Sequence, residues 1–132
     1  MPTKRRPSRV YNNAVNAYKS VEKATVSGRE TEARVLTQAA LKLRICQKRW
    51  DDENRSELLD DALNYNQRIW TIFQGELGKI DNPLPDHIKG DLLRLSGFID
   101  KRIFEVMAFP EPEKLDIIIK INENIAAGLR AG

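Results

Sequence analysis

The stretch from Leu115 to Leu129 reads LDIIIKINENIAAGL, and it decides the fold of this chain. At helical spacing, one stripe contains Leu115, Ile118, Asn122, Ile125 and Leu129, while Ile117 and Ile121 open a second face beside it. A helix with two apolar faces has to be covered on two sides, as the centre of a bundle or partly by a partner. A β-strand is the alternative for residues 116–121, because β-branched runs favour sheets, but no second strand candidate exists. We therefore expect a helix.

The spacing of apolar residues predicts four further helices, at residues 8–24, 27–50, 56–77 and 85–106. The second opens with Ser27-Gly28-Arg29-Glu30, a pattern in which serine and glutamate satisfy each other's free backbone N–H groups. Gly78 is expected to end the third in a left-handed conformation, and Pro85 fits the first turn of the fourth. Because the joints are short, we expect an all-α fold: a single compact bundle of about five mostly antiparallel helices, with no sheet.

The length and composition suit one helical domain. The chain has 132 residues, of which 41% are apolar and 31% charged, so it can bury one core. We expect residues 1–9 to be a basic, flexible extension and residues 10–130 to form a single domain. No apolar run approaches the roughly 18 residues of a membrane span, and the residues after the basic start are too polar for a signal peptide. A single cysteine, Cys46, excludes an internal disulfide, so we expect a cytoplasmic protein that makes no contact with the membrane.

The net charge of +3 conceals a strong asymmetry along the chain. Residues 1–50 hold 12 Lys or Arg against 3 acidic residues, whereas residues 51–132 hold 10 against 16. The basic half could bind nucleic acid or an acidic partner, or it could lie against the acidic half of its own chain. Internal pairing is the simplest of these alternatives.

The residues that most enzymes use for catalysis are scarce. His87 is the only histidine, and beside Asp86 in the first turn of a predicted helix it is ordinarily a surface residue. Cys46 lies on an apolar stripe and is expected to be a small core residue, although a Cys46–His87 pair is conceivable. The chain has no P-loop, no dinucleotide-binding glycine pattern and no Cys/His metal spacing. We expect no catalytic residue, no metal site, no cofactor and no enzymatic activity.

Two asparagines interrupt otherwise apolar helical faces, Asn66 in the segment 56–77 and Asn122 in the closing helix. A buried amide without partners costs roughly 1–3 kcal/mol, so each should bond to a neighbouring helix, to the other asparagine or to a bound partner. A core pair that fixes the helix register is the simpler explanation. Trp70 and Phe73, on the same wide apolar face as Asn66, are also more often core residues than contacts.

Several segments in a fixed order resemble the FlaF family of flagellar-biosynthesis regulators. They are ALNYNQRIW at residues 62–70, Leu84-Pro85, LSGFI at residues 95–99 and INENIAAGL at residues 121–129, preceded by Ala17-Tyr18 and by EARVL at residues 32–36. Each motif alone is weak, and their order and spacing over roughly residues 10–130 carry the resemblance. Gln67 departs from it, because arginine often follows the asparagine in such proteins, and the basic start is an extension.

The resemblance implies a non-enzymatic cytoplasmic regulator that promotes flagellin synthesis and export. The family is described as binding flagellin in the manner of a secretion chaperone, and as acting with FlbT, a regulator that acts on flagellin messenger RNA. An amphipathic helix of flagellin would lie in a groove formed by the wide face of residues 56–77 and the closing helix, with Arg68 at the rim. The candidate contacts with a partner are Asn66, Arg68, Trp70, Phe73, Ile117, Ile121 and Asn122.

The main alternative is a direct RNA-binding regulator of flagellin translation. Basic residues near the start and around Trp50 would contact phosphates, in the mixture of positive charge and aromatic area that nucleic-acid surfaces use. The residues concerned are Lys4, Arg5, Arg6, Arg9, Lys42, Arg44, Lys48 and Arg49. For a chaperone, in contrast, RNA would be involved only indirectly or weakly. Two further alternatives are a homodimer that forms through the second apolar face of the closing helix, and a bundle that binds no ligand.

Overall fold

The structure is a computed structural model that describes the backbone of residues 9–131 and the side chains of residues 13–16 and 29–131. The described residues form five helices and no strand, as the sequence predicts. The helices are α1 (Arg9–Lys48), α2 (Arg55–Leu77), α3 (Asp86–Ala108), the single 3-10 turn η1 (Pro112–Leu115) and α4 (Asp116–Ala131). The predicted flexible extension lies outside the described residues, except for Arg9, where α1 begins.

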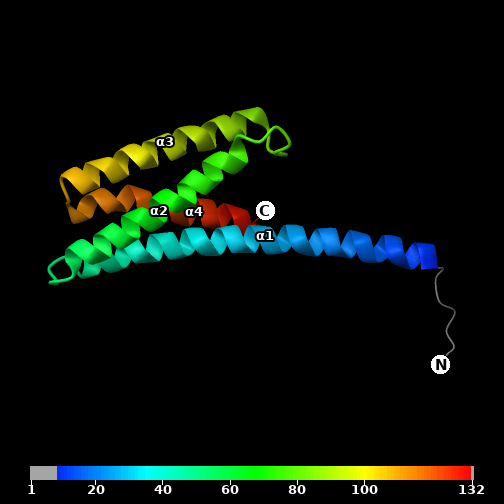
Figure 1. The fold of residues 1–132 in the computed structure, drawn as a ribbon, viewed down its shortest axis with the longest axis horizontal. Helices are drawn as coiled ribbons and strands as arrows, with labels where there is room; N and C mark the ends of the chain where they lie inside the picture. The colour runs from blue at the N-terminus through cyan, green and yellow to red at the C-terminus, as the bar shows by residue number, and fades with distance from the viewer. Residues whose placement is uncertain (1–8, 132) are drawn as a thin grey trace, which may run out of the picture.

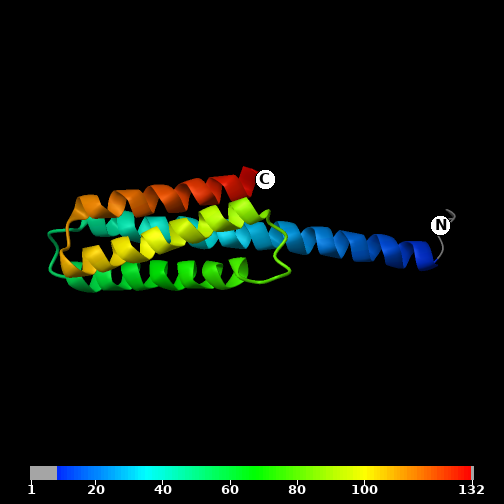
Figure 2. The ribbon, with the colours of Figure 1, turned by 90° about the horizontal axis from the view of Figure 1, so that it is seen from above.

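The four long helices alternate in direction, so the bundle runs up, down, up and down (Figures 1 and 2). α1 packs against both α2 and α4, and α3 packs against α2. The short turn after α1 and the loop between Leu77 and Asp86 impose these reversals, and η1 links α3 to α4. α3 and α4 meet near η1 and lie apart at the opposite end of the bundle, and the first part of α1 projects past that same end (Figure 1).

The first helix differs from the prediction. The segments 8–24 and 27–50 form one continuous helix of 40 residues, so Ser27-Gly28-Arg29-Glu30 does not begin a helix, and the expected count of five is reached through η1. A serine or glycine inside a helix costs at most about 1 kcal/mol relative to alanine. No proline stands beside these residues to stop the helix, so the chain continues through the apparent start signal.

Two helix ends also differ in detail. Gly78 follows α2 with φ −79° and ψ −8°, a right-handed conformation, so the predicted left-handed stop is wrong. Its N–H bonds to the carbonyl of Gln74, so the helical geometry simply continues for one more residue. Pro85 is the N-cap of α3 and lies one residue before the first turn, where its carbonyl accepts the N–H groups of Ile88 and Lys89.

The core draws side chains from all the helices and is tightest towards η1. Its largest fully buried apolar members are Trp70, Leu36, Leu43, Leu63, Ile99, Ile103, Val106, Leu115, Ile118 and Ile119. Fully burying one such side chain stabilises the fold by roughly 1.5–3 kcal/mol before conformational entropy is subtracted. The predicted segments 27–50, 56–77, 85–106 and 115–129 supply these core residues, whereas Ala14 of the predicted helix 8–24 is exposed.

Candidate partner-binding surface

A chain of buried hydrogen bonds joins three helices at the centre of the bundle. Trp70 Nε1 of α2 donates to Asn122 Oδ1 of α4 at 2.9 Å, and Asn122 Nδ2 donates to Asn66 Oδ1 at 2.6 Å. Asn66 Nδ2 in turn donates to the carbonyls of Ala62, at 2.8 Å, and of Ala39 in α1, at 3.2 Å. The two asparagines thus bond to each other and to neighbouring helices, one of the arrangements that the sequence predicts.

The residues of this network are three of the seven candidate contact residues, and all three lie in the core. Asn66, Trp70 and Asn122 are at most 1% exposed and fill the space between α2 and α4 where a groove was expected. In the closed bundle they therefore have no surface to offer a partner, because their polar atoms already bond within the core. Phe73 is half-buried, with its ring 5.7 Å from that of Trp70 in an edge-to-face arrangement, and Arg68 is exposed on the outer side of α2.

The other two candidates, Ile117 and Ile121, belong to a half-buried apolar row on α4. Ile125 and Leu129 continue this row at spacings of four, and all four side chains pack against the core but are only partly buried. We call Ile117, Ile121, Ile125 and Leu129 the α4 strip. On a helix the strip lies away from Asp116, Glu123 and Arg130, which face α1. It is therefore the apolar side of α4 that the bundle covers least.

α3 carries exposed apolar side chains that the sequence reasoning missed. Leu93, Phe104 and Met107 recur at helical spacing outside the buried stripe, and Phe104 is 65% exposed. Phe98 lies at helical spacing with the other apolar residues of the predicted helix 85–106, but it is 41% exposed, with the guanidinium of Arg102 lying 5.6 Å from its ring centre. The signal was available: Phe104 and Met107 follow Ile103 and Val106 by one residue each, which turns them about 100° from the core.

Of the basic residues proposed for RNA binding, four have side chains that the structure describes, and three of these pair with the acidic half of the chain. Lys42 Nζ lies 2.8 Å from Asp61 of α2 and 5.1 Å from the ring centre of Tyr65, and Arg49 pairs with Asp52. Lys48 is exposed. Lys4, Arg5 and Arg6 lie outside the described residues, and only the backbone of Arg9 is described.

Arg44 makes the best-formed ion pair between two helices. Its Nε and Nη2 donate to the two carboxylate oxygens of Glu123 in α4, at 3.0 and 2.8 Å. These hydrogen bonds hold the pKa of Glu123 below its ordinary value and raise the pKa of Arg44. Both groups are substantially exposed, so the pair orients α4 on α1 more than it stabilises the fold.

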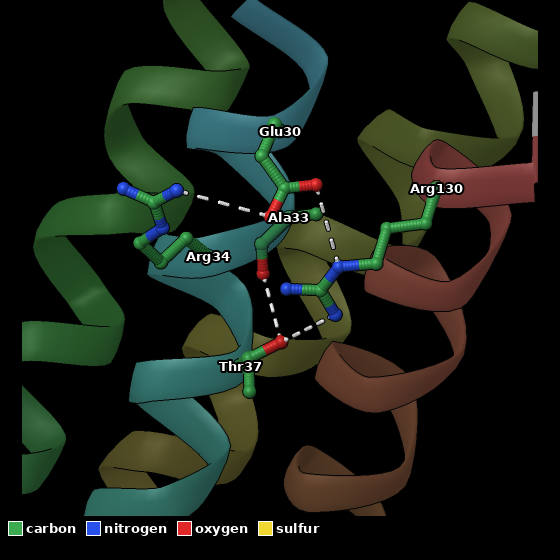
Figure 3. A network of polar contacts seen from close by, with 5 residues as sticks. All are labelled: Glu30, Ala33, Arg34, Thr37 and Arg130. Carbon is green, nitrogen blue, oxygen red and sulfur yellow. Dashed lines mark hydrogen bonds and ion pairs between the residues drawn. The ribbon is translucent and has the colours of Figure 1, made fainter. Parts of the chain in front are cut away.

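A second polar contact fixes the end of α4 on α1 (Figure 3). Arg130 Nη1 donates to Thr37 Oγ1 at 3.1 Å, and Arg130 Nε lies 3.7 Å from Glu30 Oε2. Thr37 Oγ1 donates to the carbonyl of Ala33 at 2.9 Å, and Glu30 also pairs with Arg34. The contact marks the level at which α1 leaves the bundle.

The two residues considered for catalysis, Cys46 and His87, lie in different surroundings. Cys46 is buried in the core, and burial raises the pKa of its thiol, whereas His87 is exposed at the start of α3. In the described part of the chain, no three His, Cys, Asp or Glu side chains gather so that they could hold a metal ion. Among the described helices, none combines the length and the apolar character that crossing a membrane would require.

The fold and this surface define a small up-and-down helical bundle that leaves apolar side chains uncovered on α3 and α4. A protein-family model described as "Flagellar protein FlaF" matches residues 14–129. The chain therefore belongs to the FlaF family and is a flagellar protein. The match covers every long helix of the bundle, including most of α1. Comparisons with curated proteins and with solved structures gave no match.

Proposed function

We propose that this protein is a non-enzymatic regulator that promotes flagellin synthesis and export by binding flagellin as a cytoplasmic secretion chaperone, in concert with FlbT. Membership of the FlaF family supports the flagellar part of the proposal. The observation that carries the chaperone part is the α4 strip, whose four large apolar side chains are only half-buried. Soluble monomers seldom leave such a row without a partner.

The physical mechanism is coupled folding and binding. The ends of flagellin are amphipathic helices that are disordered before polymerisation, so their apolar stripes need cover until export. The α4 strip can receive such a stripe as helix-in-groove complexes do, while the polar side of the bound helix stays in water. The entropy lost on ordering the flagellin segment lowers the net affinity, so the cargo can be released.

Direct binding of RNA is the weaker proposal. Lys42, Arg44 and Arg49 are engaged by Asp61, Glu123 and Asp52, which reduces the positive charge available to phosphates. We propose that flagellin messenger RNA is affected only indirectly, through FlbT or through the amount of free flagellin.

The test is calorimetric titration of flagellin with the wild-type chain and two α4 variants. Leu129→Asp places a carboxylate in the strip, whereas Ala127→Asp adds the same charge at an exposed position two residues away. We expect Leu129→Asp to weaken binding about tenfold or more, equivalent to 1.4 kcal/mol, and Ala127→Asp to leave it nearly unchanged. Far-UV circular dichroism checks that both variants are folded. Absence of binding by the wild-type chain would refute the chaperone function, whereas equal effects of the two variants would refute only the role of the strip.

A further inference from the structure

The outer side of α3 carries a row of apolar side chains that the bundle leaves uncovered. α3 is the long helix farthest from α1 (Figure 1). Leu93 and Met107 are each 42% exposed, and Phe104 is 65% exposed. Between them lies Gly97, where a β-carbon would meet nothing within 4 Å outside the backbone of its own helix, so the row also has an open notch. With Asp100, these residues follow alternating spacings of four and three along one side of the helix, and we call the five the α3 stripe.

α2 continues this face with uncharged residues. Gln74 Nε2 donates hydrogen bonds to Ser96 Oγ and, at 3.1 Å, to Asp100 Oδ2, so the side of α2 that carries Gln74 lies next to the α3 stripe. Residues at spacings of three and four from Gln74 share this side of the helix. We call them the α2 row, and its members are Gln67, Thr71, Gln74 and Gly78. Thr71 and Gly78 are exposed, whereas the two glutamines are half-buried.

The α3 stripe and the α2 row together are poor in charge. Of their residues only Asp100 is charged, whereas 31% of the residues in the whole chain are charged. A helix side that only faces water ordinarily carries charged and polar residues. The buried centre of a protein interface is instead depleted of charged residues and enriched in Phe and Met, two residue types that the α3 stripe exposes. The composition therefore favours a surface that another protein covers.

Asp100 determines what such a partner has to supply. Its side chain is half-buried, accepts a hydrogen bond from Gln74 and forms no ion pair with the described residues. Lys101, the next residue, is exposed and turned about 100° away around the helix. A partner that covered the face would remove the water around the carboxylate, and a buried charge without a counter-charge is strongly unfavourable. The partner therefore needs a Lys or Arg opposite Asp100, between apolar residues that contact Leu93 and Phe104.

The same carboxylate disfavours a second copy of the chain as the occupant. Asp100 is the midpoint of the α3 stripe, seven residues after Leu93 and seven before Met107. Two copies related by a two-fold axis present the same patch to each other. Whether their stripes run parallel or antiparallel, full overlap places Asp100 opposite Asp100. Like charges brought together in an interface oppose association, so a different protein is the better occupant.

We propose that the α3 stripe and the α2 row form the docking surface for an amphipathic helix of another protein, whose apolar side is interrupted by a Lys or Arg that pairs with Asp100. The α4 strip lies on another helix, which leaves it available to flagellin. The inference rests on the proposed function in taking FlbT, the proposed co-regulator, as the partner to test. The two surfaces can be tested separately, because no residue belongs to both.

The experiment measures binding of purified FlbT, and separately of purified flagellin, to the full-length chain by fluorescence anisotropy. Phe104→Ala and Phe98→Ala are matched variants, because both rings are exposed on α3 but Phe98 lies outside the α3 stripe. Asp100→Asn and Asp91→Asn are matched in the same way, and asparagine at position 100 keeps an oxygen for the Gln74 amide. The urea midpoint of unfolding should be nearly the same for all four variants, since none of these side chains is part of the buried core.

We expect the two stripe variants, Phe104→Ala and Asp100→Asn, each to weaken FlbT binding about tenfold or more. Asn at position 100 would leave the partner's cation in the interface without its counter-charge. Phe98→Ala and Asp91→Asn should change FlbT binding by no more than about twofold. Flagellin binding should be the same for all four variants, because the α4 strip is intact in each of them.

The outcomes separate the docking surface from the chaperone function. Equal effects within either matched pair, or flagellin bound without FlbT, would overturn the docking surface and leave the chaperone function standing. Weakening by Phe104→Ala but not by Asp100→Asn would also overturn the proposal, because the partner would then bring no cation to Asp100. Selective weakening of FlbT binding by both stripe variants, without any binding of flagellin, would support the surface and refute the chaperone function. A dimer in sedimentation that Phe104→Ala dissociates would assign the face to a second copy and overturn the proposal.

Discussion

Replacing Asn122 with leucine tests whether the buried hydrogen bonds hold the bundle together as one network. Asn122 accepts a hydrogen bond from Trp70 Nε1 at 2.9 Å and donates one to Asn66 Oδ1 at 2.6 Å, and none of the three side chains is more than 1% exposed. Leucine is of similar size, so the change removes both bonds and leaves no large cavity. Two buried groups lose a partner, the Trp70 N–H and the Asn66 oxygen. At about 1–3 kcal/mol each, the expected loss is roughly 2–6 kcal/mol of unfolding free energy.

The assay is urea unfolding followed by far-UV circular dichroism. Asn124→Leu is the matched control, because it makes the same chemical change at an exposed position of the same helix and should alter stability by no more than about 0.5 kcal/mol. The double variant Asn66→Leu with Asn122→Leu removes two orphaned groups, the Asn66 oxygen left by Asn122→Leu and the Asn122 N–H left by Asn66→Leu. Its loss should therefore fall short of the sum of the single losses by about 2–6 kcal/mol. The reasoning is refuted if Asn122→Leu costs no more than Asn124→Leu, or if the two single losses simply add.

The remaining predictions concern an ion pair, the cysteine and the two sides of α3. Because hydrogen bonds from Arg44 hold the pKa of Glu123 below its ordinary 4.5, the pair contributes stability above that pH and loses it as the pH falls through the lower folded-state pKa. Glu123→Gln should therefore lose less unfolding free energy than wild type between about pH 6 and pH 3, and an identical loss would count against the pair. A thiol-reactive dye should label Cys46 only after urea unfolds the chain, because burial raises the pKa of the thiol; equally fast labelling of the native protein would contradict its burial. Ile103→Ala should cost about 2–5 kcal/mol in urea unfolding and Phe104→Ala less than about 0.5, and similar costs would show that α3 is turned differently.

The sequence predicts the core well because burial follows helical periodicity. The stripes that contain Leu36, Leu63 and Ile118 are buried, and the two asparagines within them bond to each other. A buried amide demands a partner, and only a few polar atoms lie within reach of a helix face, so a bond between them was among the few solutions. Which candidate residues are core and which are contacts was not accessible, because that depends on how closely α2 and α4 approach.

The features that the sequence does not reveal arise from competition between weak local signals and packing. The pattern at Ser27 and Glu30 would satisfy a helix start, yet a continuous helix keeps every backbone hydrogen bond, so the capping gain is never needed. The exposure of Phe104 is different, because its place one residue after Ile103 already turns it away from the core stripe. The pairing of Arg44 with Glu123, 79 residues apart in sequence, depends wholly on tertiary placement.

The asparagine network lies between a tightly packed part of the core towards η1 and a looser part at the other end. Towards η1 the core side chains Leu115 and Ile118 are fully buried, whereas Phe73 and Leu129 beyond the network are only half-buried. Separating α2 from α4 would break the hydrogen bond from Trp70 to Asn122 and expose two amides. The free-energy cost of losing these buried hydrogen bonds rises more steeply with separation than that of parting an apolar core of equal area. The network therefore limits how far a partner can open the bundle. Under the proposed chaperone function, a bound flagellin helix would therefore use the surface already present on the α4 strip, and the folded core would not have to be rebuilt when the cargo leaves.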